Sequence, residues 1–191
     1  MNNYEKILAT DGGVFKSFID SMSSLLDSTS SEREILMKGR GYLANLVSND
    51  QWLPDQCAQS YVDRYAQHLL YKDPENRFSV VSFVWGPGQK TPVHDHTVWG
   101  LVGVIRGSEL CDEYCLVDGA PQPQGKSHVL KKGQVEAVSP TIGDWHQVAN
   151  HVDDQPSISI HVYGGDIGAI RRHMLSPDGK VVDFVSGYST I

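Results

Sequence analysis

The stretch Gly88-Gln89-Lys90-Thr91-Pro92-Val93-His94-Asp95-His96 places two histidines two residues apart, directly after a Gly/Pro turn. Residues i and i+2 of a β-strand point to the same face, so His94 and His96 can direct both imidazoles at one point. A third histidine follows in Gly143-Asp144-Trp145-His146-Gln147-Val148-Ala149-Asn150. Three neutral nitrogen ligands leave a divalent metal ion its full charge and open positions for anionic groups. His94, His96 and His146 are therefore predicted to bind a metal.

The residues around this stretch carry the pattern of short β-strands. Phe78-Ser79-Val80-Val81-Ser82-Phe83-Val84-Trp85 is β-branched and aromatic and ends at a Gly-Pro-Gly turn. A last hairpin is expected to turn at Ser176-Pro177-Asp178-Gly179, before a strand at 181–185. Residues 120–125 contain two prolines and are predicted to form a surface loop. The other predicted strands are 64–71, 98–106, 109–117, 127–131, 134–138, 146–149 and 157–163.

Helical signals dominate before residue 63. Apolar residues between 14 and 26 recur at helical spacing, and Ser31-Glu32-Arg33-Glu34 has the capping-box form that opens a second helix. Pro54 marks the start of a third, short helix. Many short strands broken by turns predict a mostly β fold, a sandwich or barrel over 64–191, with a helical N-terminal layer over 1–63. We expect a single domain spanning residues 1–191.

The composition excludes several classes of protein. The 191 residues are 40% hydrophobic and 20% charged, as in ordinary soluble domains. The net charge is −7, and no run of Lys or Arg exceeds two residues, which argues against a nucleic-acid or anionic membrane surface. No apolar stretch approaches the roughly 18 residues of a membrane span, and the N-terminus lacks the apolar core of a signal peptide. A cytoplasmic location is expected, and the oligomeric state stays open.

The cysteines do not indicate a disulfide framework, because Cys57, Cys111 and Cys115 are odd in number and form no CxxC motif. Cys111 and Cys115 stand four apart in a strand-like run, so they are expected to share a face as buried core thiols. A thiolate metal site is the alternative interpretation.

The two histidine segments resemble the two signature motifs of the cupin superfamily. In the first motif a glycine precedes HxH, a metal-binding glutamate follows it, and a further glycine ends the strand. The positions that match are Gly88, His94, His96 and Gly107, with Gly100 in the place of the glutamate. The second motif is matched by Gly133, Pro140, Gly143, His146 and Asn150, with single extra residues on either side of Pro140. The resemblance implies a double-stranded β-helix (jelly-roll) barrel.

The missing glutamate narrows the resemblance to the thiol dioxygenases, the cysteine dioxygenase family. The resemblance implies a mononuclear Fe(II) on three histidines that uses O₂ to oxidise a small thiol to its sulfinate. The alternating run Ser157-Ile158-Ser159-Ile160-His161-Val162-Tyr163 supports it. Ser159, His161 and Tyr163 should share one face. In this family such side chains form a hydrogen-bonded relay beside the iron.

Two departures from the mammalian enzymes resemble the bacterial branches of the family. A mammalian cysteine that crosslinks to the relay tyrosine falls at Gly100, so no crosslink to Tyr163 is expected. The Ser-Pro that follows that tyrosine is replaced by Gly164-Gly165.

The resemblance also implies a substrate class. Cysteine-specific members carry an arginine, which clamps the substrate carboxylate, where this chain has Gln67. The branch that resembles 3-mercaptopropionate dioxygenase has glutamine there, with a second arginine after the relay tyrosine. Arg171 and Arg172 both stand in range, and Arg172 matches better by spacing. The favoured substrate is therefore 3-mercaptopropionate, with L-cysteine next.

The remaining histidines are expected to be surface or hydrogen-bonded residues: His68, His128, His151 and His173. Asp95 should point away from the metal and make a structural hydrogen bond, since it alternates with the two histidines. Two other functions stay open, namely a different cupin metalloenzyme or a non-enzymatic cupin that binds a small molecule. The rival enzyme reactions do not call for the Ser-His-Tyr relay, and no DNA-binding helix is visible to support a sensor.

Overall fold

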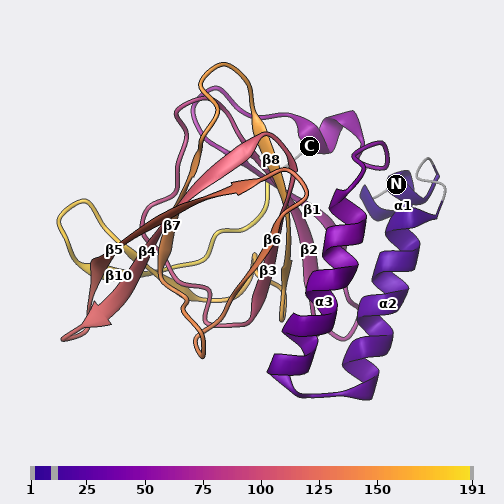
Figure 1. Ribbon diagram of the computed structural model, residues 1–191, viewed down its shortest axis with the longest axis horizontal. Helices are drawn as coiled ribbons and strands as arrows, with labels where there is room; N and C mark the ends of the chain where they lie inside the picture. Colours follow the sequence, from indigo (N-terminus) through magenta and orange to yellow (C-terminus); the bar gives the residue numbers. More distant parts are fainter. Residues whose placement is uncertain (1–2, 10–12, 190–191) are drawn as a thin grey trace.

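The computed structural model describes residues 3–9 and 13–189. Its main sheet has five antiparallel strands in the order β1-β2-β8-β3-β6, so neighbours in the sheet are mostly distant in sequence (Figure 1). The bounds are β1 Ala66–Lys72, β2 Ser79–Trp85, β8 Ser157–Tyr163, β3 Gly100–Arg106 and β6 Val135–Val138.

A second layer faces this sheet and closes the barrel. Its strands pair as β5-β4-β7 and as β10-β9. The bounds are β4 Ser108–Val117, β5 Ala120–Lys131, β7 His146–Asn150, β9 Arg172–Leu175 and β10 Val181–Phe184. The segment that carries His94 joins the two pairs, because isolated bridges link His94 to His146 of β7 and to Met174 of β9. The result is the predicted double-stranded β-helix, with the histidine segments between the layers.

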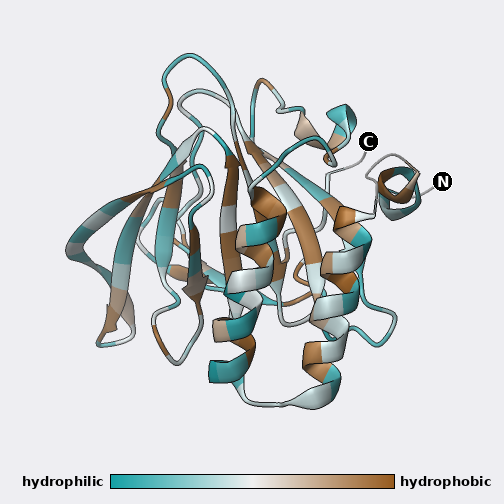
Figure 2. Ribbon diagram, turned by 45° about the vertical axis from the view of Figure 1, so that its right-hand side comes forward, coloured by the Kyte–Doolittle hydropathy of each residue, from teal (hydrophilic) through white to brown (hydrophobic). Residues whose placement is uncertain are grey.

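The N-terminal helices cover the outer face of the five-stranded sheet, as Figures 1 and 2 show. Their bounds are α1 Asn3–Leu8, α2 Val14–Ser28, α3 Glu32–Val47 and a 3₁₀ helix at Asp55–Ala58. Phe15 and Met22 of α2 and Leu43 of α3 are fully buried in one apolar cluster with Ile160 and Val162 of β8. The helices therefore bury the apolar face of the sheet, and the other face is left to line the barrel.

The mostly β cupin fold and its helical layer are confirmed, while the single-domain organisation stays a prediction. Helix α1 was not predicted. Ser31 is the N-cap of α3, as predicted, but the hydrogen bonds of a capping box are absent. Its side chain makes no cap bond, and Glu34 pairs with Lys38 instead.

The predicted loop at 120–125 is wrong, because these residues begin β5. β5 is an edge strand that pairs only with β4 among the described strands, with Pro121 opposite Leu116 and Pro123 opposite Tyr114. Proline lacks an N–H and is tolerated where one side of a strand has no partner. The proline signal therefore marked a sheet edge, and the turn lies just before it, at Asp118 and Gly119.

The prediction that Cys111 and Cys115 are both buried core thiols is also wrong, since Cys111 is buried and Cys115 is exposed. The pairing of β4 with β5 shifts register between Asp112 and Tyr114. Cys111 lies in the part of β4 that pairs with β7, whereas Cys115 lies beyond the last such pair, at Glu113, where the described partner of β4 is β5 alone. Among the described helices, none combines the length and the apolar character needed to cross a membrane.

Candidate metal centre and its cavity

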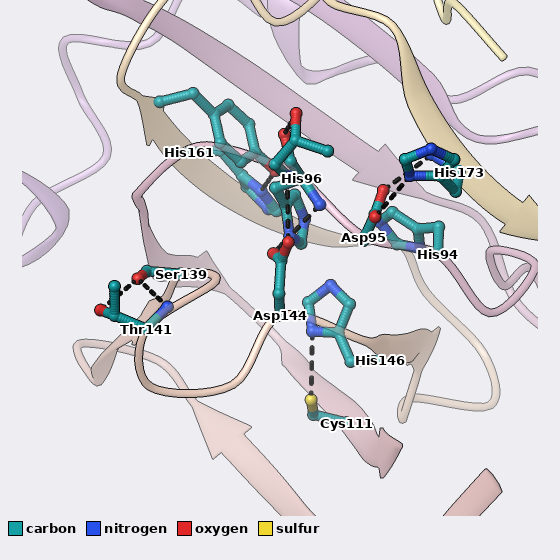
Figure 3. Close-up of polar contacts among 12 residues, drawn as sticks. His94, Asp95, His96, Cys111, Ser139, Thr141, Asp144, His146, His161 and His173 are labelled. Atoms are coloured by element: carbon teal, nitrogen blue, oxygen red, sulfur yellow. Dashed lines mark hydrogen bonds and ion pairs between the residues drawn. The ribbon is translucent and has the colours of Figure 1, made fainter. Parts of the chain in front are cut away.

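His94, His96 and His146 converge inside the barrel, and their ring centroids lie 4.8–5.0 Å apart (Figure 3). They are 8%, 1% and 4% exposed, and each offers a ligand atom within 4.8 Å of the others. The expected regular strand is absent around the first pair, because His94 forms only isolated bridges and His96 lies outside the named strands. The alternation of side chains still holds, so both rings reach the same point.

One nitrogen of each ring is already engaged. Nδ1 of His94 lies 3.1 Å from the Pro92 carbonyl oxygen, and Nδ1 of His146 lies 3.5 Å from Sγ of Cys111. Nδ1 of His96 lies 2.8 Å from Oδ1 of Asp144. The Nε2 atoms are therefore left as metal donors, and the partners of Nδ1 fix the orientation of each ring. Three buried imidazoles held in this way fit a single divalent transition-metal ion.

Electrostatics keep the centre in its metal-binding form. Burial, and next the neighbouring charge of His96, lower the pKa of His94 to about 3. Burial also lowers the pKa of His146 well below its usual value, with His96 and His94 adding to the effect. Because a metal binds only the neutral imidazole, protons do not compete for these two ligands near neutral pH.

Asp144 is a site residue that the sequence analysis missed. Its carboxylate accepts hydrogen bonds from the backbone N–H groups of His96 and Thr97, in addition to its contact with the His96 ring. Burial alone would raise the pKa of Asp144, but these hydrogen bonds outweigh burial and lower it. The only signal in the sequence was its position beside the second glycine of the second motif.

Asp95 behaves as predicted. It points away from the centre, and its carboxylate accepts from the backbone N–H of His173 at 2.7 Å and lies 2.8 Å from that ring's Nδ1. The contact ties the HxH segment to β9 and so contributes to holding His94 and His96 in place.

The three polar residues of β8 form the predicted hydrogen-bonded chain. Ser159 Oγ lies 2.7 Å from Nε2 of His161, and Nδ1 of His161 lies 2.8 Å from the hydroxyl of Tyr163. Trp85 Nε1 donates to Ser159 Oγ at 3.3 Å. Burial holds the pKa of His161 well below its usual value and raises the pKa of Tyr163. His161 is thus neutral and has one donor and one acceptor for its two neighbours.

Gly100 makes room for Tyr163. A Cβ at Gly100 would lie 2.9 Å from Cδ1 of the Tyr163 ring and 2.9 Å from Cγ2 of Val138. The ring of Tyr163 in turn stacks on that of His96, with centroids 5.3 Å apart. The glycine that replaces the usual cupin glutamate therefore lets the tyrosine ring approach the metal centre.

A narrow cavity of about 30 Å³ connects the metal centre, the relay and the predicted substrate residues. Gln67 is 7% exposed and Arg172 is 4% exposed, and both line this cavity. Arg171 instead has a 76% exposed side chain and pairs with Asp183 at 3.2 Å. Of the two candidate arginines, Arg172 is the one at the cavity. The other residues that line this cavity are Tyr65, Phe83, Trp85, Thr91, Pro92, His94, His146, Val148, His161, Tyr163, Phe184 and Ser186.

The C-terminal segment contributes lining residues that no motif had indicated. Ser186 Oγ accepts from Arg172 at 2.6 Å and from Nε2 of Gln67 at 3.0 Å, which links the two predicted residues. The guanidinium of Arg172 lies 4.6 Å from the Phe184 ring centroid. The same segment lines an outer hollow of about 400 Å³ that shares Tyr65 and Gln67 with the inner cavity.

The remaining histidines differ from one another. Nε2 of His68 lies 3.0 Å from the Gln59 carbonyl oxygen, His173 pairs with Asp95, and His151 is exposed. These three match the prediction. His128 does not, because the fold brings it together with Cys111 and Glu136 in a second cluster of ligand atoms within 4.8 Å of one another.

Comparison with known proteins identifies the family. Residues 49–174 match the family described as Cysteine dioxygenase type I. The chain belongs to this family. Cysteine dioxygenase type 1 from Danio rerio is 25% identical over 113 residues, which are 56% of this chain and 55% of the relative. The chain thus aligns with about half the length of that curated relative.

Solved structures with a similar fold share less sequence. A conserved protein with a double-stranded β-helix domain from Klebsiella pneumoniae is 18% identical, with 68% of this chain and 91% of that chain covered and a TM-score of 0.48. A cupin 2 conserved barrel domain protein from Rhodopseudomonas palustris is also 18% identical, with 63% and 75% covered and a TM-score of 0.45.

Proposed function

We propose that this protein is an iron(II)-dependent thiol dioxygenase that oxidises a small thiol carboxylic acid, with 3-mercaptopropionate preferred over L-cysteine. The reaction is RSH + O₂ → RSO₂H: the S–H and O–O bonds break, two S–O bonds form with both oxygen atoms from O₂, and the thiol proton ends on a sulfinate oxygen. Sulfur loses four electrons and O₂ gains them, so no further reductant is needed. The proposal includes a cytoplasmic location.

The observation that carries the proposal is one cavity with three kinds of group on its walls. These groups are the histidines of the metal centre, His94 and His146, the relay residues His161 and Tyr163, and the polar pair Arg172 and Gln67. A substrate with a sulfur at one end and a carboxylate at the other would engage the first and the third. The second would then lie beside the reacting sulfur, and such positioning is a large part of catalysis.

His94, His96 and His146 would hold the iron through their Nε2 atoms. When bound, iron(II) would favour the thiolate over the thiol and bring it next to O₂. Three neutral ligands suit this task, because the metal keeps its charge for two anionic groups of one substrate. The Nδ1 contacts to Pro92, Asp144 and Cys111 keep the three rings aimed at one point.

Arg172 is proposed to bind the substrate carboxylate. Its Nε is buried and has no hydrogen-bond partner among the described residues, although one terminal nitrogen donates to Ser186. Burial lowers the pKa of Arg172, yet a guanidinium stays protonated in proteins. A buried charged donor without a partner is costly, and a carboxylate would satisfy it. Gln67 supplies no charge, because its amide is neutral. The amide nitrogen already donates to Ser186 and to the Gly187 carbonyl oxygen.

The lining of the cavity favours a substrate without an amino group. No aspartate or glutamate is among the described residues that line it, and Phe83, Trp85, Val148 and Phe184 make several of its walls apolar. The ammonium of L-cysteine would be buried there without an anionic partner, at a cost in free energy. 3-Mercaptopropionate carries the same thiol and carboxylate without that ammonium.

The relay is proposed to direct the Tyr163 hydroxyl into the cavity. Trp85 donates to Ser159, the Ser159 hydroxyl donates to Nε2 of His161, and Nδ1–H of His161 donates to the Tyr163 oxygen. The proton of Tyr163 is then free to hydrogen-bond a reacting oxygen or the substrate. Burial raises the pKa of Tyr163, so the hydroxyl keeps this proton across the physiological pH range.

The test is oxygen uptake by iron-loaded protein with a panel of thiols and product analysis for the sulfinate. We expect one O₂ consumed per sulfinate formed and a higher kcat/KM for 3-mercaptopropionate than for L-cysteine. A preference for L-cysteine would contradict the substrate assignment alone. If iron-loaded protein consumed no O₂ with any thiol, the proposed activity would be contradicted. The two alternatives, another cupin enzyme or a small-molecule-binding protein, would then be favoured.

Arg171 provides a matched control for Arg172. Arg172→Ala should keep its iron and lose roughly 10- to 100-fold in kcat/KM for 3-mercaptopropionate, the range expected for losing a charge-assisted hydrogen bond. Arg171→Ala removes an exposed charge from the neighbouring position and should behave as the unsubstituted protein. Equal kinetics in the two variants would exclude Arg172 as the carboxylate ligand.

A further inference from the structure

A second cluster of metal-ligand side chains lies behind His146. Sγ of Cys111, a ring nitrogen of His128 and a carboxylate oxygen of Glu136 all lie within 4.8 Å of one another. They border a second cavity of about 220 Å³, which Asp144 and His146 of the first centre also line but which the relay and Arg172 do not. We propose that these three residues form a second metal site, for a divalent ion of intermediate softness such as Zn²⁺. The proposal does not require the thiol dioxygenase activity, although Cys111 also contacts Nδ1 of His146 in the first centre.

The topology of the barrel assembles the site from both layers. Cys111 of β4 and His128 of β5 are direct cross-strand partners, so their side chains leave the sheet side by side. Glu136 belongs to β6, the edge strand of the five-stranded sheet. An ion bound to all three would therefore link the two layers of the barrel at that edge. Such a link adds stability only when the metal is present, which can be measured.

The setting of His128 matches that of a metal ligand. Its Nε2 lies 2.5 Å from Oε2 of Glu136, and its Nδ1 lies 3.5 Å from Oε1 of Glu113. One imidazole thus stands between two carboxylates. Histidines that bind metals commonly present one nitrogen to the ion and the other to a carboxylate. With the ion between His128 and Glu136, Glu113 would take the second role.

The donor set selects the class of metal. Sulfur, nitrogen and oxygen together suit Zn²⁺, which binds them at about 2.3, 2.0 and 2.1 Å in a tetrahedral arrangement. With these bond lengths, the donor atoms of a tetrahedral site lie roughly 3.2–3.7 Å from one another. Nε2 of His128 and Oε2 of Glu136, now 2.5 Å apart, would move apart slightly, and the Cys111 sulfur would stay within the 4.8 Å that the cluster spans. The fourth position would open into the cavity. The donor set differs from the all-nitrogen set of His94, His96 and His146, which contains no sulfur.

Because only the second cluster contains a sulfur ligand, a metal–thiolate signal distinguishes the two sites. Metal-free protein is titrated with Co²⁺, a spectroscopic substitute for Zn²⁺, without thiols in the buffer. We expect two equivalents to bind, and we expect one of them to produce the near-ultraviolet absorption of a cobalt–thiolate bond. A His94→Ala variant, with an incomplete nitrogen triad, should keep that absorption.

His128→Gln and Glu136→Gln test the second cluster without altering the sulfur that touches His146. Each variant should bind one equivalent of Co²⁺ and lose the thiolate absorption. Zn²⁺ should raise the melting temperature of His94→Ala but not of His94→Ala combined with His128→Gln. His151→Gln, which changes an exposed histidine, is the matched control and should keep both equivalents.

Two outcomes would overturn the proposal. The unsubstituted protein could bind a single equivalent without thiolate absorption, which would leave His128 as an ion-pair partner of two glutamates. The absorption could instead persist in His128→Gln, which would place the cobalt on another thiol, such as the exposed Cys115. Circular dichroism of each variant establishes that it is folded before its metal content is compared.

Discussion

The two faces of strand β8 are equally buried and chemically opposite. Ile158, Ile160 and Val162 are at most 2% exposed and pack in the apolar cluster beneath the helices. Ser159, His161 and Tyr163 are at most 3% exposed and form the hydrogen-bonded chain inside the barrel. Burial alone therefore does not distinguish a residue that stabilises the fold from one that serves the site.

The difference lies in what each face gains from burial. An apolar side chain gains free energy when it leaves water, whereas a buried hydroxyl or imidazole only recovers in hydrogen bonds what it lost in hydration. A polar network inside a barrel is thus a weak source of stability. His161 and Tyr163 line the cavity, and Ser159 contacts His161. Under the proposed function, the interior face therefore serves chemistry and the helical face serves the fold.

The largest expected effect is the loss of the metal in His146→Ala, which tests the interior face. Removing one of three ligands should weaken iron binding by more than the roughly 10- to 100-fold that follows loss of a ligand's hydrogen-bond partner. Activity should fall with metal content, measured by inductively coupled plasma analysis and oxygen uptake. Stoichiometric iron and full turnover in the variant would refute the triad.

Ile160→Ala tests the helical face of the same strand. Ile160 is fully buried among residues of the helices and the sheet, so the cavity left behind should cost about 2–5 kcal/mol in the free energy of unfolding. Urea denaturation measures the loss. Iron stoichiometry and kcat should stay unchanged at a temperature where the variant is folded. A variant that unfolds normally but loses activity would mean that the two faces are not independent.

How far the sequence predicts this molecule depends on how local each signal is. The alternation in β8 is contained in seven residues, and the structure has the predicted chain. The HxH pair and the second motif each lie within one short segment, so their convergence followed from the fold that they predict. Asp144, Ser186 and Glu136 were missed because each matters through a partner at least ten residues away or in another layer.

The errors have local physical causes of their own. Cys115 is exposed because β4 extends past its last pair with β7, at Glu113, and no residue type in that run indicates where this pairing ends. The prolines at 121 and 123 indicated a loop, yet an edge strand tolerates them equally well. His128 seemed to lack partners because Cys111 reaches it only through the pairing of β4 with β5.

Tyr163→Phe examines one member of the interior face without emptying it. Only the hydroxyl is lost, so the ring still packs on His96 and the metal should be retained. We expect kcat to fall about 100-fold, which is typical for a lost acid–base or hydrogen-bond contribution. Steady-state oxygen uptake, normalised to bound iron, measures the change. A rate equal to that of the unsubstituted protein would leave the relay with a structural role.

The last prediction concerns the pH dependence of stability and rests on Glu109 of β4, a buried carboxyl close to Ser159 and Trp85. It is 2% exposed, and neither carboxyl oxygen has a hydrogen-bond partner among the described residues. Burial raises the pKa of Glu109 to about 8, although the nearby Ser159 and Trp85 oppose the rise. In contrast to the relay, this group is expected to destabilise the fold when it ionises.

The sign follows from the direction of that shift. The unfolded chain releases the Glu109 proton near its ordinary pKa of about 4.3, whereas the folded protein holds it up to about pH 8. The stabilising contribution of the protonated form is therefore complete below about pH 4.3 and is lost as pH rises toward 8, by at most about 1.4 kcal/mol per pH unit.

Glu109→Gln keeps the shape of the side chain and cannot ionise. Urea denaturation at a series of pH values should show that the variant lacks this decline between about pH 5 and pH 8, so that its advantage over the unsubstituted protein grows with pH. Parallel stability curves for the two proteins would mean that Glu109 ionises as freely in the fold as in water, and that the interior face tolerates an unpaired charge.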